Sequence, residues 1–163
     1  MSVEATAAAW FAPFVLPVCL YVAFTDLREM RITNQAVGAL VVIFAIGGAL
    51  LYPIDVYLWR WLHLVVVLTI GVVLNLAGGM GAGDAKFLAA AAPYVAVTDL
   101  SFVFYILAAT SLAGVLVHRI AKNSPLHRLT PHWKSWSETH RFPFGFPLGT
   151  ALGAYLVLTA LRG

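Results

Sequence analysis

Two acidic residues, Asp26 and Asp84, interrupt a sequence that is otherwise almost wholly apolar. Asp84 follows a glycine-rich run at residues 79–83, and Asp26 stands where a long apolar stretch stops. A carboxylate beside a bilayer is costly, which makes both acids candidates for function. Two carboxyl groups brought close together share a proton, because both cannot comfortably carry a negative charge. The pair therefore suggests aspartyl catalysis, in which the ionised acid draws a proton from water and the protonated acid polarises a carbonyl group.

The composition predicts an integral membrane protein. Hydrophobic residues make up 61% of the 163 residues and charged residues only 10%, which does not suit a small water-soluble core. A membrane span takes about 20 residues, so the chain has room for roughly six short spans and little more. We therefore expect a single membrane-embedded domain over residues 1–163.

Separate apolar stretches predict an all-α, polytopic fold with about six transmembrane helices. They cover residues 5–24, 36–52, 61–77, 85–97, 100–117 and 142–161. The fourth stretch is too short to cross the hydrocarbon alone, so we expect it to be tilted, extended by its flanks or enclosed by its neighbours. The first stretch is long enough to remain as an anchor, and Glu4 stands where a signal peptide would have basic residues.

The basic residues predict the orientation of the chain. If the helices alternate in direction, most Lys and Arg residues fall on one side, namely Arg28, Arg31, Lys86, Arg119, Lys122, Arg128, Lys134 and Arg141. The opposite side receives only Arg60 and Arg162, together with three acids. Because cytoplasmic loops carry the excess of Lys and Arg, we expect both chain ends outside the cytoplasm. Asp26 and Asp84 then face the cytoplasm together.

The segment 119–141 is the one sizeable polar connection, and we expect it to be a cytoplasmic loop. It mixes basic residues with Trp133, Trp136 and three histidines. Aromatic and basic residues interleaved beside a bilayer are typical of a loop that rests on lipid headgroups, which we favour over a nucleic-acid or zinc site. Pro125 and Pro131 argue against one continuous helix. Use of the loop as a substrate platform or gate stays open.

Several residues near the two acids are candidates for binding substrate or shaping the site. Gly81 and Gly83 remove side-chain bulk beside Asp84 and allow a substrate backbone to approach, although an ordinary flexible turn is the alternative. The ammonium group of Lys86 either favours the ionised acid or extends to the membrane interface. Asn34 is predicted to cap the second helix through its side-chain oxygen.

Nothing in the sequence predicts a metal site or a cofactor. Cys19 is the single cysteine, which excludes a disulfide framework and a cysteine-based zinc site. The histidines lack the spacing of a two-histidine metalloprotease motif. Aspartyl chemistry needs no metal, so we expect none.

The chain resembles the prepilin peptidases of the type IV leader peptidase family, which are aspartic membrane peptidases with a Gly-x-Gly-Asp motif. The resemblance rests on Asp26-Leu27-Arg28 with Arg31, Ile32 and Asn34, on residues 79–86, and more weakly on Phe142-Pro143-Phe144-Gly145. It departs from the family pattern at Thr33, where relatives commonly have proline. By this resemblance, Asp26 and Asp84 are the catalytic acids. They would remove a short basic leader from a pilin-like precursor, cutting after glycine at the cytoplasmic face of the inner membrane.

Larger members of the family resemble a fusion of this core with a methyltransferase segment that contains paired Cys-x-x-Cys motifs, and neither occurs here. We therefore expect no N-methylation of the product, as in the compact enzymes of Flp or tight-adherence pili. Presenilin-like proteases also use Gly-x-Gly-Asp, but they place their first acid within a transmembrane helix and carry a Pro-Ala-Leu motif that is absent here.

A function of another class also fits the acids. A small membrane transporter or secretion-assembly subunit would use Asp26, Asp84 and Lys86 as a proton or ion relay, since acids inside membranes often serve that purpose. Removal of a leader from a precursor distinguishes the two hypotheses.

Overall fold

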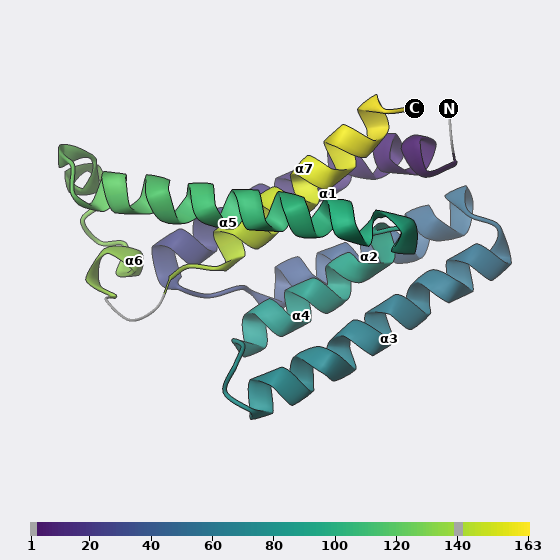
Figure 1. Ribbon diagram of the computed structural model, residues 1–163, viewed down its shortest axis with the longest axis horizontal. Helices are drawn as coiled ribbons and strands as arrows, with labels where there is room; N and C mark the ends of the chain where they lie inside the picture. The colour runs from purple at the N-terminus through teal and green to yellow at the C-terminus, as the bar shows by residue number, and fades with distance from the viewer. Residues whose placement is uncertain (1–2, 139–141) are drawn as a thin grey trace.

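The computed structural model describes residues 3–138 and 142–163, and within these ranges the chain is helical without a β-strand (Figure 1). The longer helices are α1 (Val3–Glu29), α2 (Asn34–Leu51), α3 (Ile54–Leu76), α4 (Ala82–Ala91), α5 (Leu100–Lys122) and α7 (Gly145–Leu161). The short ones are η1 (Ala92–Tyr94), η2 (Val97–Asp99), η3 (Pro125–Leu129) and α6 (Lys134–Ser137). The predicted all-α, polytopic fold is confirmed.

Four segments are long and apolar enough to cross a membrane, namely Glu4–Glu29, Asn34–Leu51, Ile54–Leu76 and Val97–Lys122, and α7 is a shorter apolar helix. Several helices continue beyond the predicted apolar stretches. α3 begins directly after Pro53 rather than at residue 61, and α5 runs on to Lys122. A helix ends where capping or backbone geometry ends it, not where polar residues begin. Hydropathy therefore located the helices but not their ends.

Helix α4 is the short fourth helix, and its neighbours enclose it. It packs against α2, α3 and α7, and it buries Ala85, Phe87 and the alanines that follow. The approach to α3 is close, because a Cβ atom added to Gly71 would lie 2.9 Å from the Cβ of Ala85. Two 3-10 turns, η1 and η2, then carry the chain to α5. Two of the arrangements expected for this stretch are therefore observed. Neighbouring helices enclose α4, and the turns that follow it extend it.

The most extensive contact between helices joins α1 and α7, which run antiparallel side by side, with both chain ends at the same end of the molecule (Figure 1). A Cβ atom at Gly149 would lie 2.7 Å from the carbonyl oxygen of Cys19, and one at Gly153 would lie 3.0 Å from Leu16. Small residues let helix backbones approach this closely in membranes. This packing places the N-terminus of α7 beside the last turn of α1.

A buried polar cluster joins the helices near the chain termini. The guanidinium group of Arg60, whose residue is 3% exposed, donates to Glu4 and to the carbonyl oxygen of Pro93. It also lies over the ring of Tyr52, 5.1 Å from its centroid, and the Tyr52 hydroxyl donates to Glu4. A buried charge requires such partners. The cluster thereby ties α3 to α1, to the end of α2 and to the turn after α4.

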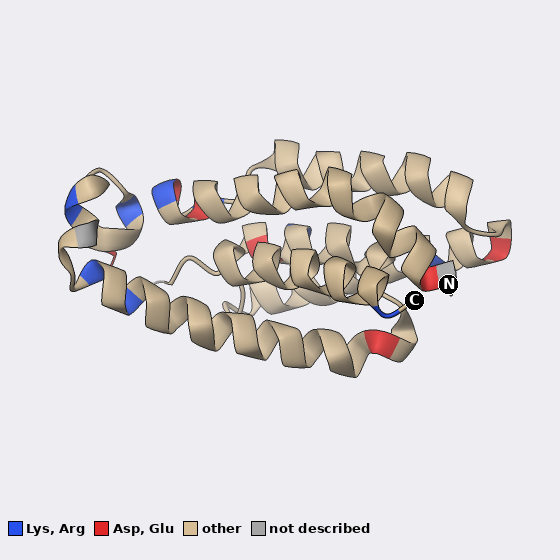
Figure 2. Ribbon diagram, turned by 90° about the horizontal axis from the view of Figure 1, so that it is seen from above, with Lys and Arg blue, Asp and Glu red and all other residues tan. Residues whose placement is uncertain are grey.

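Most Lys and Arg residues lie at the end of the molecule opposite the two termini (Figure 2). This end carries the connection between α5 and α7, which includes α6 (Figure 1). Which end of the molecule faces the cytoplasm stays a prediction. Arg141 of the predicted basic set lies outside the described residues.

Substitution of Gly149 by alanine tests the close packing of α1 and α7. The added methyl group meets a backbone oxygen that cannot shift by itself, so we expect Gly149→Ala to lower the free energy of unfolding by about 1–3 kcal/mol. Gly38→Ala is the control, because nothing lies within 4 Å of its Cβ position. There, the higher helix propensity of alanine should raise stability by up to about 1 kcal/mol. Unfolding of both variants in detergent measures the difference, and equal stabilities would contradict the packing.

Candidate active site

Asp26 lies in the last turn of α1, and its carboxylate is bound by the first residue of α7. The residue is only 6% exposed, and its Oδ2 accepts a hydrogen bond of 2.6 Å from the backbone N–H of Gly145. A helix N-terminus has unpaired N–H groups and a positive dipole end, so it suits a carboxylate. A side chain at Gly145 would collide with the acid, because its Cβ would lie 2.9 Å from the Asp26 Cγ.

The position of Asp26 corrects one expectation. The sequence placed the acid just beyond the first helix, but α1 continues to Glu29. The helix ends at Met30, which adopts a positive φ of 54° and donates its N–H to the carbonyl oxygen of Asp26 at 2.9 Å. This is the left-handed termination common at helix ends. The distinction from presenilin-like proteases therefore cannot rest on where the first acid stands relative to its helix.

The prediction that Asn34 caps α2 is wrong. Thr33 is the N-cap residue, and its side-chain oxygen accepts a hydrogen bond of 3.3 Å from the N–H of Ala36. Asn34 is the first residue of the helix itself. Threonine and asparagine are both good N-caps, so the sequence alone did not fix which of two adjacent residues would take the position.

Asp84 lies in the first turn of α4 and is half-buried. Its carboxyl group folds back over Gly81, since a Cβ atom there would lie 2.8 Å from the Asp84 Oδ2. Burial raises the pKa of Asp84 above its usual range, because the charged form loses solvation. Gly83 instead faces Ile32 in the connection between α1 and α2. Both glycines thus have packing roles, and their use by a substrate backbone stays a prediction.

The turn before Asp84 is an organised structure. Gly78 adopts a positive φ of 76°, which glycine tolerates without steric cost. The side-chain amide of Asn75 donates to the carbonyl oxygen of Met80 at 2.8 Å, and the N–H of Gly79 donates to Leu74. Asn75 was missed from the sequence, although a polar side chain in the last turns of an apolar helix was a usable signal.

The two acids interact electrostatically, but no hydrogen bond joins the carboxyl groups of these two described residues. Each stands beside a helix N-terminus, Asp26 at that of α7 and Asp84 at that of α4. The helices α4 and α7 also pack against each other. The structure thus places both acids at one end of the helix bundle, within electrostatic range of each other.

Two other candidate residues are in contact. The ammonium group of Lys86 donates to the side-chain oxygen of Asn34 at 3.3 Å, at an exposed position. The pair links α4 to the start of α2. The rise in the pKa of Asp84 comes from its burial. The observed partner of Lys86 is Asn34.

An aromatic group packs the loop between α5 and α7 against the end of α1. The ring of Trp133 meets Phe24 edge-on with centroids 5.8 Å apart, and it stacks on Trp136 at 5.9 Å. Trp136 in turn stacks on His118 at 4.9 Å. Phe24 precedes Asp26 by two residues in α1, so the loop lies near the buried acid. Whether it rests on lipid headgroups or acts as a substrate platform or gate stays a prediction.

The family model of the type IV leader peptidase family matches residues 14–118, which is more than half of the chain. The chain belongs to the type IV leader peptidase family. The match contains both acids, and it ends before Gly145, the residue that binds Asp26. Comparisons with curated proteins and with solved structures gave no match. Membership supports a peptidase that acts on the leader of pilin-type precursors in general.

Gly145 was quoted in the weakest of the sequence motifs and was not predicted as a site residue. In this leader peptidase its N–H donates the 2.6 Å hydrogen bond to Asp26, and the backbone of the next residue, Phe146, also interacts with the acid. The contact joins residues 119 positions apart, so no local pattern reveals it. A usable signal was the glycine at the start of a helix, because the N–H groups of a helix N-terminus can bind a carboxylate.

Gly145→Ala tests the contact with Asp26. The N–H donor remains, but the new methyl group displaces the carboxylate, and a misplacement of about 1 Å can cost about 100-fold in rate. We therefore expect peptidase activity to fall roughly 10- to 100-fold. Gly153→Ala, on the same helix, is the control, since its new Cβ meets only the movable end of Leu16. Cleavage assays on the two purified variants make the comparison, and equal activity would show that the contact does not matter.

Proposed function

We propose that this leader peptidase is an aspartic endopeptidase of the cytoplasmic membrane, with Asp26 and Asp84 as its catalytic acids. It removes the N-terminal leader of pilin-like precursors by cutting after glycine. The observation that carries the proposal is the placement of the two acids, which stand within electrostatic range at adjoining helix ends in the part of the chain that matches the family.

The chemistry needs one proton between the two acids. The ionised acid takes a proton from water, and the oxygen of that water adds to the scissile carbonyl carbon while the protonated acid donates to the carbonyl oxygen. Collapse of the intermediate breaks the C–N bond, and the amine leaves with a proton returned by the pair. Burial at Asp84 favours its neutral form, so the site is suited to hold that proton.

The connection between α1 and α2 supports a peptidase that does not methylate its product. Only residues 30–33 separate the two helices, and no Cys-x-x-Cys motif occurs in the chain. This is the compact form that resembles the enzymes of Flp or tight-adherence pili. The proposal therefore includes cleavage without N-methylation.

The distribution of charge supports an active site that faces the cytoplasm. Most basic residues gather at the end of the molecule opposite both termini (Figure 2). Arg28 and Arg31 flank the end of α1 and lie close to Asp26 in the sequence. By the positive-inside rule, this end is cytoplasmic and both termini are outside.

Isosteric substitution of each acid tests the catalytic pair. Asp26→Asn and Asp84→Asn keep the side-chain shape but cannot shuttle the proton, so we expect each to lower cleavage by about three orders of magnitude or more. Asp55→Asn is the matched control, because Asp55 is exposed in the first turn of α3. The measurement is removal of the leader from a pilin-like precursor, with N-terminal sequencing of the product.

The same variants distinguish a peptidase from an ion relay. A relay predicts an intact precursor with the unaltered chain and coupled ion movement that Asp26→Asn or Asp84→Asn abolishes. Cleavage at the normal rate by either asparagine variant would reject the catalytic pair.

The pH dependence of cleavage tests the shared proton. Activity should follow a bell-shaped curve with two apparent pKa values that belong to the pair. Because burial raises the pKa of Asp84, its proton is retained to a higher pH than in a free aspartate. Activity should therefore persist above the usual aspartate range and fall as the pH rises through the upper value. Profiles of kcat/KM in vesicles check this, and a flat profile across the mildly acidic range would count against it.

A further inference from the structure

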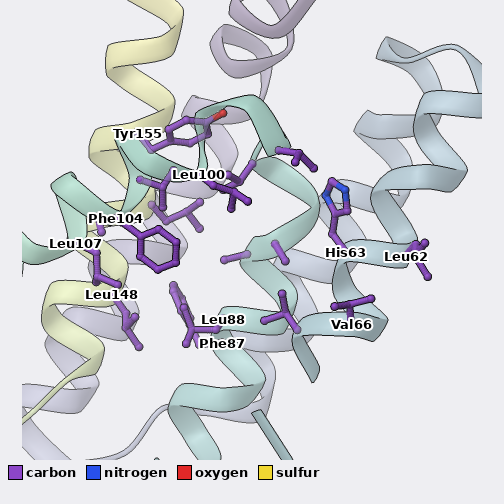
Figure 3. A pocket seen from close by; sticks show the side chains of 18 of the residues that line it. Leu62, His63, Val66, Phe87, Leu88, Leu100, Phe104, Leu107, Leu148 and Tyr155 are labelled. Carbon is purple, nitrogen blue, oxygen red and sulfur yellow. The ribbon is translucent and has the colours of Figure 1, made fainter. Parts of the chain in front are cut away.

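An apolar groove with a volume of about 470 Å³ lies in the described part of the structure (Figure 3). Its lining comes from α3, α4, α5 and α7 and the turns after α4. Figure 3 shows Leu62, His63 and Val66 on one side and Phe104 and Leu107 on the other. None of the described residues that line it is an Asp, Glu, Lys or Arg. The groove therefore suits an apolar occupant within the bilayer.

One end of the groove lies next to the candidate site. Phe87 and Leu88 line it and follow Asp84 by about one turn of α4. Leu148 also lines it and follows Gly145 by about one turn of α7. Figure 3 shows the lining continuing from Phe87, Leu88 and Leu148 toward Tyr155. An apolar segment in the groove thus has one end beside both acids.

The lining of the groove combines small and bulky residues. It includes Ala91, Ala92 and Ala151, and small residues allow helix backbones to approach each other in membranes. It also includes Trp59 on α3 and Phe104 on α5. A second hollow of about 370 Å³ lies between α1 and α2, but no residue of α4 or α7 lines it. It therefore lacks the connection to the site.

We propose that the groove between α3 and α5 binds the apolar helix that follows the cut site in the precursor. This inference rests on the proposed function and adds the surface that holds the substrate. A scissile bond at the membrane boundary continues into an apolar segment, and that segment needs an apolar surface that starts at the acids. The groove meets this requirement, and burial of the helix against it positions the bond.

A matched pair of tryptophan variants on α3 tests the groove. Val66 lines it, whereas the adjacent Val65, also largely exposed, does not. We expect Val66→Trp to fill the groove and lower kcat/KM for the precursor by at least about tenfold, mainly through KM. Val65→Trp should leave cleavage unchanged. Equal rates for both variants and the unaltered chain, or equal losses in both, would overturn the inference.

Photocrosslinking identifies the occupant directly. A photoreactive phenylalanine analogue is placed at Phe104, which lines the groove, or at the adjacent Tyr105, which does not. The Asp84→Asn background keeps the precursor uncut. We expect a crosslink between enzyme and precursor from position 104 but not from position 105. Crosslinks only to lipid, or to a second copy of the chain, would overturn the proposal.

The two proposals fail in different ways. If the unaltered chain cuts no precursor, the peptidase function fails, and the crosslink from position 104 still reports whether the groove binds an apolar helix. If the unaltered chain cuts the precursor and Val66→Trp cuts it equally well, the function stands and the groove inference fails.

Discussion

The hydrogen bond between Asp26 and the N-terminus of α7 is the contact on which the site depends. It holds a buried carboxylate with a backbone N–H rather than with a basic side chain, and a buried polar group must find such a partner. Because the donor belongs to the backbone, the helix itself must come within reach. The close antiparallel packing of α1 and α7, made possible by Gly149, provides that approach.

A second physical constraint acts on α4. A helix as short as α4 cannot span the hydrocarbon, so its two ends cannot both reach water. The backbone groups at an end inside the membrane must be satisfied by protein. The neighbours α2, α3 and α7 enclose it, and the polar cluster around Arg60 reaches the turn that follows it. Asp84, in its first turn, is thereby fixed relative to α7. Helix α7 is thus common to both acids, because it binds Asp26 and packs against the helix that carries Asp84.

The site combines a polar end with an apolar groove. Acids that activate water need access to water, whereas a substrate that continues into the bilayer needs a dry surface. The structure places the two side by side, because Asp84 and the groove-lining residues Phe87 and Leu88 stand one turn apart on the same helix. In this arrangement, α4 carries both a catalytic candidate and part of the surface proposed to hold the substrate.

The sequence by itself determined the class of protein and the approximate helices, and it singled out the two acids as candidates, because hydropathy and isolated charges are local properties of the chain. Its motifs also identified the family. Tertiary structure decided that Gly145 binds Asp26, that Lys86 reaches Asn34, and that four helices form a groove beside the acids. These contacts join residues far apart in the chain, and they depend on helix packing distances, which no local pattern encodes.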